Sequence, residues 1–213
     1  MQNAHAFRAR VPGRPRVDRL ERPWQSQRPA VHAREEPAIT SRLPDLTLVL
    51  GGARSGKSAF AESLVLRSGL RPLYLATAQA LDEEMRRRVE HHRRGRGDAW
   101  TLVEEPLELS DALRAESRPD RAVLVDCLTL WLTNLLLAER DPVLESDRLL
   151  AVLTAPPGPV VLVSNEVGQG IVPTNALARR FVDEAGRLHQ RLAAAAQSVV
   201  LVTAGLPQHL KRP

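Results

Sequence analysis

From residue 46 onwards, short apolar runs alternate with longer segments in which apolar residues recur every three or four positions. The apolar runs are nearly continuous, which is typical of strands buried on both faces of a parallel sheet. They predict strands at 46–50, 73–76, 122–125, 160–163 and 199–202. The segments between them predict helices at 57–67, 82–93, 107–116, 128–139, 141–153 and 173–196. This alternation predicts an α/β domain with a doubly wound, mostly parallel sheet and helices on both faces.

The predicted helix 173–196 has the clearest helical period. It opens with Pro173, a residue favoured in a first helical turn. Its apolar side chains recur every three or four residues and form one face, which we expect to pack on the sheet. That face consists of Leu177, Phe181, Ala185, Leu188 and Leu192.

Residues 1–45 have no apolar period and contain six of the sixteen prolines. Such a segment is too polar to offset the entropy of ordering, so we expect an Arg/Pro-rich extension outside a catalytic domain at 46–213. Nine arginines against five acidic residues give this segment most of the chain's net charge of +5. A basic arm can bind nucleic acid. Because no basic block exceeds one residue, we favour a solvated extension and expect no nucleic-acid partner.

The rest of the composition indicates a cytoplasmic protein. No apolar run approaches the roughly 20 residues needed to span a bilayer, and no apolar signal segment stands at the N-terminus. The single cysteine, Cys127, excludes an internal disulfide and suits a reducing compartment. We interpret Cys127 as a packing residue rather than a reactive thiol.

Residues 51–58 match the phosphate-binding pattern G-x-x-x-x-G-K-[ST], between a predicted strand and a predicted helix. In such a loop, glycines turn the backbone amides towards phosphate oxygens, and the helix N-terminus adds positive potential. Lys57 is expected to reach the outer phosphates, and the Ser58 hydroxyl to bind Mg²⁺. The motif predicts a P-loop NTPase-type fold that binds a nucleotide through Gly51, Gly52, Ala53, Arg54, Ser55, Gly56, Lys57 and Ser58.

Asp126 directly follows the apolar run 122–125 and is the candidate second Mg²⁺ ligand. A carboxylate at the end of a buried parallel strand lies at the sheet edge where α/β proteins bind ligands. The alternative is an aspartate that caps the next helix. The sequence alone leaves both interpretations open.

Two adjacent histidines follow the acidic start of the predicted helix 82–93. On a helix, His92 falls within the apolar stripe of Leu81, Met85 and Val89, whereas His91 points about 100° away from His92. The arginines after His92 favour a neutral, nucleophilic imidazole and offer cations to phosphate oxygens. A core histidine with a satisfied hydrogen bond is an equal alternative from the spacing alone.

Several stretches beyond the phosphate loop carry a resemblance that covers nearly all of residues 48–211. They are YLATAQALDEEM (74–85), EHHRRGR (90–96), WTLVEEPLEL (100–109), VDCLTLWLTNLL (125–136), SNEVGQGIVPTNALARRFVDEAGRLHQ (164–190) and AGLPQHLK (204–211). With GGARSGKS (51–58), the chain resembles the bifunctional adenosylcobinamide kinase / adenosylcobinamide-phosphate guanylyltransferase family of cobalamin biosynthesis. Residues 1–45 depart from that family, whose members normally begin just before the loop.

The resemblance implies a transferase with two reactions. ATP or GTP phosphorylates adenosylcobinamide, and GMP from GTP then passes through a histidine to the cobinamide phosphate, giving adenosylcobinamide-GDP. It implies that His92 is the guanylylated residue and that the assembly is a homotrimer, for which an apolar surface around 131–137 is a candidate. It also implies nucleotide contacts at Thr77, Ala78, Gln79, Arg93, Arg94, Gly95, Arg96, Glu104 and Asp126. Without it, Glu104 reads as an ordinary surface carboxylate.

Two other functions remain open. A simple P-loop kinase would use His92 only to bind phosphate and would form no covalent nucleotide adduct. A nucleotide-dependent regulatory module would grip nucleic acid through residues 1–45, and salt would weaken that binding.

Overall fold

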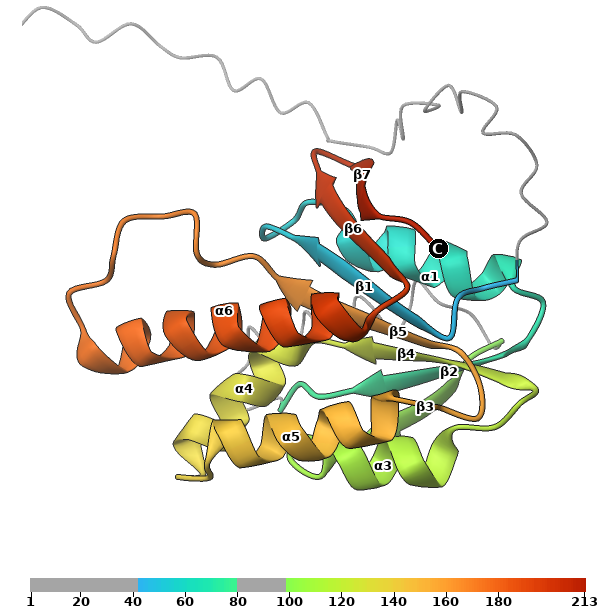
Figure 1. The fold of residues 1–213 in the computed structure, drawn as a ribbon, viewed down its shortest axis with the longest axis horizontal. Helices are drawn as coiled ribbons and strands as arrows, with labels where there is room; N and C mark the ends of the chain where they lie inside the picture. Colours follow the sequence, from blue (N-terminus) through green and yellow to red (C-terminus); the bar gives the residue numbers. More distant parts are fainter. Residues whose placement is uncertain (1–41, 80–98) are drawn as a thin grey trace, which may run out of the picture. The chain divides into compact units, whose positions relative to one another are not determined.

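The computed structural model describes residues 42–79 and 99–213, and these residues contain a seven-stranded sheet (Figure 1). The strand order is β3-β2-β4-β5-β1-β6-β7, and only the β6–β7 pair is antiparallel. β5 therefore lies between β1 and β4. The strands are β1 (Leu46–Gly51), β2 (Arg71–Ala76), β3 (Thr101–Glu104), β4 (Arg121–Asp126), β5 (Val160–Asn165), β6 (Ser198–Thr203) and β7 (Leu206–Lys211).

The helices cover both faces of this sheet, as predicted. Alternate strand residues point to opposite faces, so each strand supplies side chains to two cores. One core packs against α1, and the other packs against α3 to α6 (Figure 1). The helices are α1 (Lys57–Arg67), α3 (Leu109–Glu116), α4 (Leu128–Leu137), α5 (Pro142–Leu153) and α6 (Ala176–Ala195). The predicted helix 82–93 lies outside the described residues.

The packed core begins before residue 46. Leu43 is buried and belongs to the core on the α1 face. The described domain therefore includes part of the segment expected to be an extension. Residues 1–41 lie outside the described part of the chain.

Two strands were not predicted because both lie at sheet edges. The four residues of β3 are exposed or half-buried, and β7 is exposed along most of its length. Neither strand shows the continuous apolar run of a strand buried on both faces. Pro207 also weakens the strand pattern in β7, although an edge strand tolerates proline.

The start of α6 differs from the prediction. The helix begins at Ala176 rather than Pro173, because the Asn175 side chain accepts a hydrogen bond from the Ala178 amide and caps the N-terminus. In the C-terminal part of the helix the predicted apolar face is buried, at Ala185, Leu188 and Leu192. Leu177, in contrast, is 53% exposed, because the first turn of the helix does not pack on the core.

The prediction that residues 131–137 expose an apolar surface for assembly is wrong for most of α4. Trp131, Leu132 and Leu135 are buried within the chain, and the Trp131 indole donates a hydrogen bond of 2.9 Å to the Leu107 carbonyl. Leu137 at the end of the helix is 61% exposed. The continuous apolar composition of α4 therefore reflects packing inside the domain.

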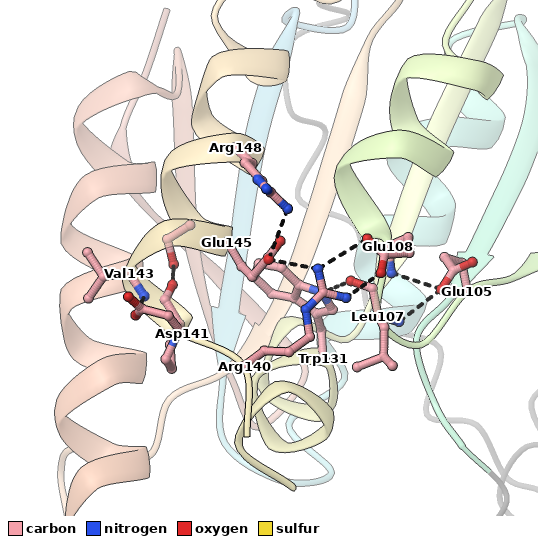
Figure 2. Close-up of polar contacts among 11 residues, drawn as sticks. Glu105, Leu107, Glu108, Trp131, Arg140, Asp141, Val143, Glu145 and Arg148 are labelled. Carbon is pink, nitrogen blue, oxygen red and sulfur yellow. Dashed lines mark hydrogen bonds and ion pairs between the residues drawn. The ribbon is translucent and has the colours of Figure 1, made fainter. Parts of the chain in front are cut away.

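An ion-pair cluster joins α3, α4 and α5 (Figure 2). Arg140, just after α4, forms ion pairs with Glu108 at the start of α3 and, at 2.7 Å, with Glu145 in α5. Arg148 lies 3.2 Å from the same Glu145 carboxylate. Hydrogen bonds from Arg140 lower the pKa of Glu108, and Glu108 and Glu145 raise the pKa of Arg140. The cluster holds three helices together on one face of the sheet.

Among the helices that the structure describes, none is long and apolar enough to cross a membrane.

Candidate functional site

The phosphate loop connects β1 to α1, and two of its positions, Gly51 and Gly56, require glycine. A Cβ on Gly51 would lie 2.5 Å from both Ser55 Oγ and the Val202 carbonyl. Gly56 has a φ of 94°, a left-handed conformation that side chains disfavour. The Gly205 amide donates to the Ser55 carbonyl at 2.8 Å and so ties the loop to the β6–β7 turn. The loop has a defined conformation for receiving phosphate.

Lys57 begins α1 and is largely buried, with 9% of its surface exposed. Its Nζ donates a 3.3 Å hydrogen bond to the Gly52 carbonyl, across the loop. The ammonium group therefore lies against the loop backbone, beside the helix N-terminus. A helix N-terminus and a lysine at one place favour bound anions.

Ser58 and Asp126, predicted as ligands of one cation, are in contact. The Ser58 hydroxyl donates to Asp126 Oδ2 at 3.2 Å. The N-cap of α4 is Cys127 and makes no side-chain capping bond, so the helix-cap alternative for Asp126 does not hold. A third partner was not predicted from the sequence: the Tyr74 hydroxyl donates to the same oxygen at 2.5 Å. The only signal was a tyrosine within the apolar β2 run.

This oxygen pair suits a hard cation such as Mg²⁺, which binds one or two protein oxygens together with phosphates and water. No cluster of three or more His, Cys, Asp or Glu residues that could hold a metal occurs within 42–79 and 99–213. A cation here would need further oxygen ligands besides this pair, such as nucleotide phosphates and water. That dependence fits a metal that arrives with its substrate.

The structure places the other described candidates at the same edge of the sheet. Ala76 pairs with both Glu104 and Asp126, so the ends of β3, β2 and β4 are level. Ala78 and Gln79 follow β2 and are half-buried, whereas Glu104 is exposed at the end of the edge strand. His92, Arg93, Arg94, Gly95 and Arg96 lie outside the described residues.

Thr77 already uses its polar atoms within the protein. Its hydroxyl donates to the Cys127 carbonyl at 2.7 Å and accepts from the Cys127 amide at 2.9 Å. Its amide donates to the Asp126 carbonyl at 3.1 Å, and its carbonyl accepts from the Asn134 side chain at 2.8 Å. Thr77 therefore fixes the end of β4, and with it the backbone of Asp126.

The polar residues at the end of β5, Asn165 and Glu166, were not predicted as part of the site. β5 lies between the loop strand β1 and the Asp126 strand β4. Asn165 is level with Gly51, and the Glu166 amide donates to the Gly51 carbonyl at 3.0 Å. The Asn165 amide group donates to the Thr129 hydroxyl at 3.1 Å, and that hydroxyl lies 2.8 Å from Cys127 Sγ. The polar pair Asn165–Glu166 after an apolar run was the available signal.

Two buried titratable residues near the ends of these strands, Cys127 and His189, make their polar contacts within the protein. Burial, and secondarily Asp126, raises the pKa of the Cys127 thiol, which favours the protonated form expected of a packing residue. Burial lowers the pKa of His189, although Glu166 acts in the opposite direction. His189 Nε2 lies 2.7 Å from the Ser164 hydroxyl. This histidine fastens α6 to the end of β5.

Comparisons with known proteins agree with the motifs at this edge. Residues 47–210 match the sequence model of the family described as cobinamide kinase / cobinamide phosphate guanyltransferase. The chain is 54% identical to the bifunctional adenosylcobalamin biosynthesis protein CobP of Pseudomonas aeruginosa, across 77% of this chain and 96% of that protein. It is 45% identical to the proteins named CobU in Escherichia coli and Salmonella typhimurium, across 78% of this chain and 99% of each relative.

Proposed function

The chain belongs to the cobinamide kinase / cobinamide phosphate guanyltransferase family, and we propose that it performs both reactions at one nucleotide site on this sheet edge. In the first reaction, ATP or GTP phosphorylates the hydroxyl of adenosylcobinamide. In the second, GMP from GTP passes to the cobinamide phosphate and yields adenosylcobinamide-GDP. The protein is thus a transferase of cobalamin biosynthesis.

One observation carries the proposal of a shared site: Lys57 and the Ser58–Asp126 pair flank a single phosphate loop. The kinase reaction breaks the bond to the γ phosphate, whereas guanylyl transfer breaks the bond at the α phosphate and releases pyrophosphate. Negative charge grows on the β phosphate of the departing nucleoside diphosphate in the kinase reaction, and on the departing pyrophosphate in guanylyl transfer. Positive groups placed there before the reaction stabilise either leaving group.

We further propose that Ser58 and Asp126 hold Mg²⁺ with the nucleotide. Mg²⁺ would neutralise charge on the phosphates. Tyr74 and Ser58 both donate to Asp126 Oδ2, and these bonds orient the carboxylate. Thr77 fixes the Asp126 backbone from the neighbouring strand. The protein's own part is therefore to hold the oxygen ligands in place before the nucleotide arrives.

We propose His92 as the nucleophile of the guanylyl transfer. The family resemblance and the helical projection select the same residue of the pair. A covalent intermediate divides one displacement into two, so the enzyme can position each acceptor in turn. In the first, an imidazole nitrogen bonds to the α phosphorus as pyrophosphate leaves. In the second, a cobinamide phosphate oxygen displaces that nitrogen.

The test is incubation of the full chain with α-labelled GTP and Mg²⁺, followed by denaturation. We expect the label to stay on the wild-type protein and on the control variant His91→Ala, and to be lost in His92→Ala. A phosphoramidate should be labile to acid and stable to base. His92→Ala should keep much of the kinase activity, because that step needs no nucleophile on the enzyme. An unlabelled wild-type protein with kinase activity would favour the simple kinase, and label that persists in His92→Ala would exclude His92 as the nucleophile.

A further inference from the structure

Glu166 lies next to the phosphate loop and is unused in the reactions described so far. It directly follows β5, whose neighbours are the loop strand β1 and the Asp126 strand β4. Its amide bonds to the Gly51 carbonyl at 3.0 Å, and its Oε1 accepts a 2.7 Å hydrogen bond from the Gly168 amide. The side chain is half-buried, and its charge raises the pKa of the nearby His189, against the effect of burial. Glu166 is thus a carboxylate that a backbone amide holds in place beside the loop.

An apolar surface begins on the other side of Glu166. The segment 167–175 leads from the sheet edge to α6 (Figure 1), and its Ile171 and Val172 are 98% and 73% exposed. A hollow of about 230 Å³ lies between this segment and the start of α6. Its lining combines the apolar Val167, Ile171, Val172 and Val182 with the charged Arg179 and Asp183. Glu166 therefore stands between the phosphate loop and an exposed, partly apolar segment, against which we expect the organic acceptor to lie.

The other described carboxylates at this edge are less suited to meet an acceptor. Asp126 Oδ2 already accepts two hydrogen bonds, from Ser58 and Tyr74. Glu105 Oε1 accepts the backbone amides of residues 107 and 108. Glu104 ends the edge strand β3, and β2 and β4 lie between it and β5. Asp183 also lines the hollow, but it belongs to α6, whereas Glu166 is the carboxylate whose backbone bonds to the loop strand at Gly51.

We propose that Glu166 is the general base of the kinase reaction, an inference that rests on the shared nucleotide site. The acceptor hydroxyl oxygen bonds to the γ phosphorus while the bond from that phosphorus to the bridging oxygen breaks. A nucleoside diphosphate leaves with the bonding electrons, and the hydroxyl proton passes to the Glu166 carboxylate. Glu166 then returns the proton to water. A positioned base typically contributes about 10²–10⁴-fold to a rate.

Guanylyl transfer to the cobinamide phosphate needs no such base. Its acceptor is a phosphate, which is already ionised near neutral pH. Glu166 should therefore separate the two reactions, whereas a residue that only binds the nucleotide would affect both. This difference distinguishes a base from a structural carboxylate.

The experiment compares wild type, Glu166→Gln and the control Asp45→Asn in separate assays of the two reactions, with purified cobinamide or cobinamide phosphate as acceptor. Asp45 is exposed just before β1, at the end of the strands opposite to Glu166. We expect Glu166→Gln to lower the kinase kcat by about 100-fold or more and to keep guanylyl transfer within about threefold of wild type. Asp45→Asn should leave both reactions unchanged.

Three results would overturn the inference: a kinase kcat of Glu166→Gln within about threefold of wild type, an equal fall in both reactions of a folded variant, or the same split in Asp45→Asn. Guanylyl transfer by the variant also reports that it is folded. If Glu166→Gln does not fold, Glu166→Asp takes its place, because aspartate keeps the carboxylate but moves that group back by one methylene. Glu166→Asp must then show the same selective loss of kinase activity. A wild-type protein without kinase activity would instead contradict the proposed function.

Discussion

Tyr74→Phe removes a single hydroxyl and so tests how Asp126 is held. Tyr74 is the only tyrosine of the chain, is 3% exposed, and donates its 2.5 Å hydrogen bond to Asp126 Oδ2. Its ring packs edge-on against Trp100, with centroids 5.9 Å apart. Phenylalanine preserves that packing, so the change tests the hydroxyl rather than the ring.

Two magnitudes follow from this geometry. A hydrogen bond to a charged group contributes about 1.5–3 kcal/mol, so we expect the free energy of unfolding to fall by that order. In a domain of this size the loss lowers the Tm by roughly 3–10 °C. If Asp126 binds Mg²⁺, loss of its orienting partner should raise the Mg²⁺ concentration for half-maximal activity about 10–100-fold.

The assay is a Mg²⁺ titration of both reactions, together with thermal melts. We expect saturating Mg²⁺ to restore most of the activity of Tyr74→Phe. Ser146→Ala is the matched control, because the buried Ser146 hydroxyl bonds to the Pro142 carbonyl in α5. It should cost stability without moving the Mg²⁺ midpoint. An unchanged or lower midpoint in Tyr74→Phe would refute the argument that this hydroxyl orients a metal ligand.

Three further predictions concern the rest of the chain. Lys57→Ala should lower both reactions by about 10²–10³-fold, and full retention of either one in parallel assays would exclude a shared site. Deletion of residues 1–41 should leave both turnover rates and the Tm nearly unchanged, and a Tm lowered by many degrees would contradict this. Glu108→Gln should lower the free energy of unfolding by about 0.2–1 kcal/mol at pH 7. This difference from wild type should shrink as the pH falls below the ordinary glutamate pKa of 4.5. The sign follows because Arg140 lowers the folded-state pKa of Glu108, so this stability is full above pH 4.5 and is lost as the pH falls through the lowered folded-state pKa. Urea unfolding at pH 7 and 3.5 measures it, and an equal difference at both would disprove it.

The central strands were predictable because burial on both faces demands continuous apolar runs. Residues 122–125 of β4 are fully buried, so their sequence carries a strong signal. Edge strands such as β3 have no such demand and resemble connecting segments. The start of α6 was misplaced because Pro173 and Asn175 both favour a helix N-terminus, and only the Asn175 side-chain bond to the Ala178 amide decides between them.

The site was predictable where one local pattern contained the chemistry. The loop and Asp126 belong to such patterns, and the structure brings Ser58 and Asp126 into contact. Tyr74 and Glu166 could not be found in this way, because their placement depends on which strands are neighbours. The sequence shows that five runs form strands, but it does not show that β5 lies between β1 and β4. His92 stays a prediction from the resemblance and the helical projection.

A single nucleotide site that serves both reactions restricts which of the two activities each mutation can change. Groups that act on the outer phosphates, such as Lys57, must affect both reactions, because the leaving group carries its new charge there in both: on the β phosphate of the diphosphate, or on pyrophosphate. Groups that act on only one acceptor must affect one reaction, as we expect for Glu166 in phosphorylation and His92 in guanylyl transfer. Two independent nucleotide sites would instead allow a loop mutation to remove one activity and spare the other. The pattern across these three residues therefore tests the shared site more strictly than the loss of activity in any one variant.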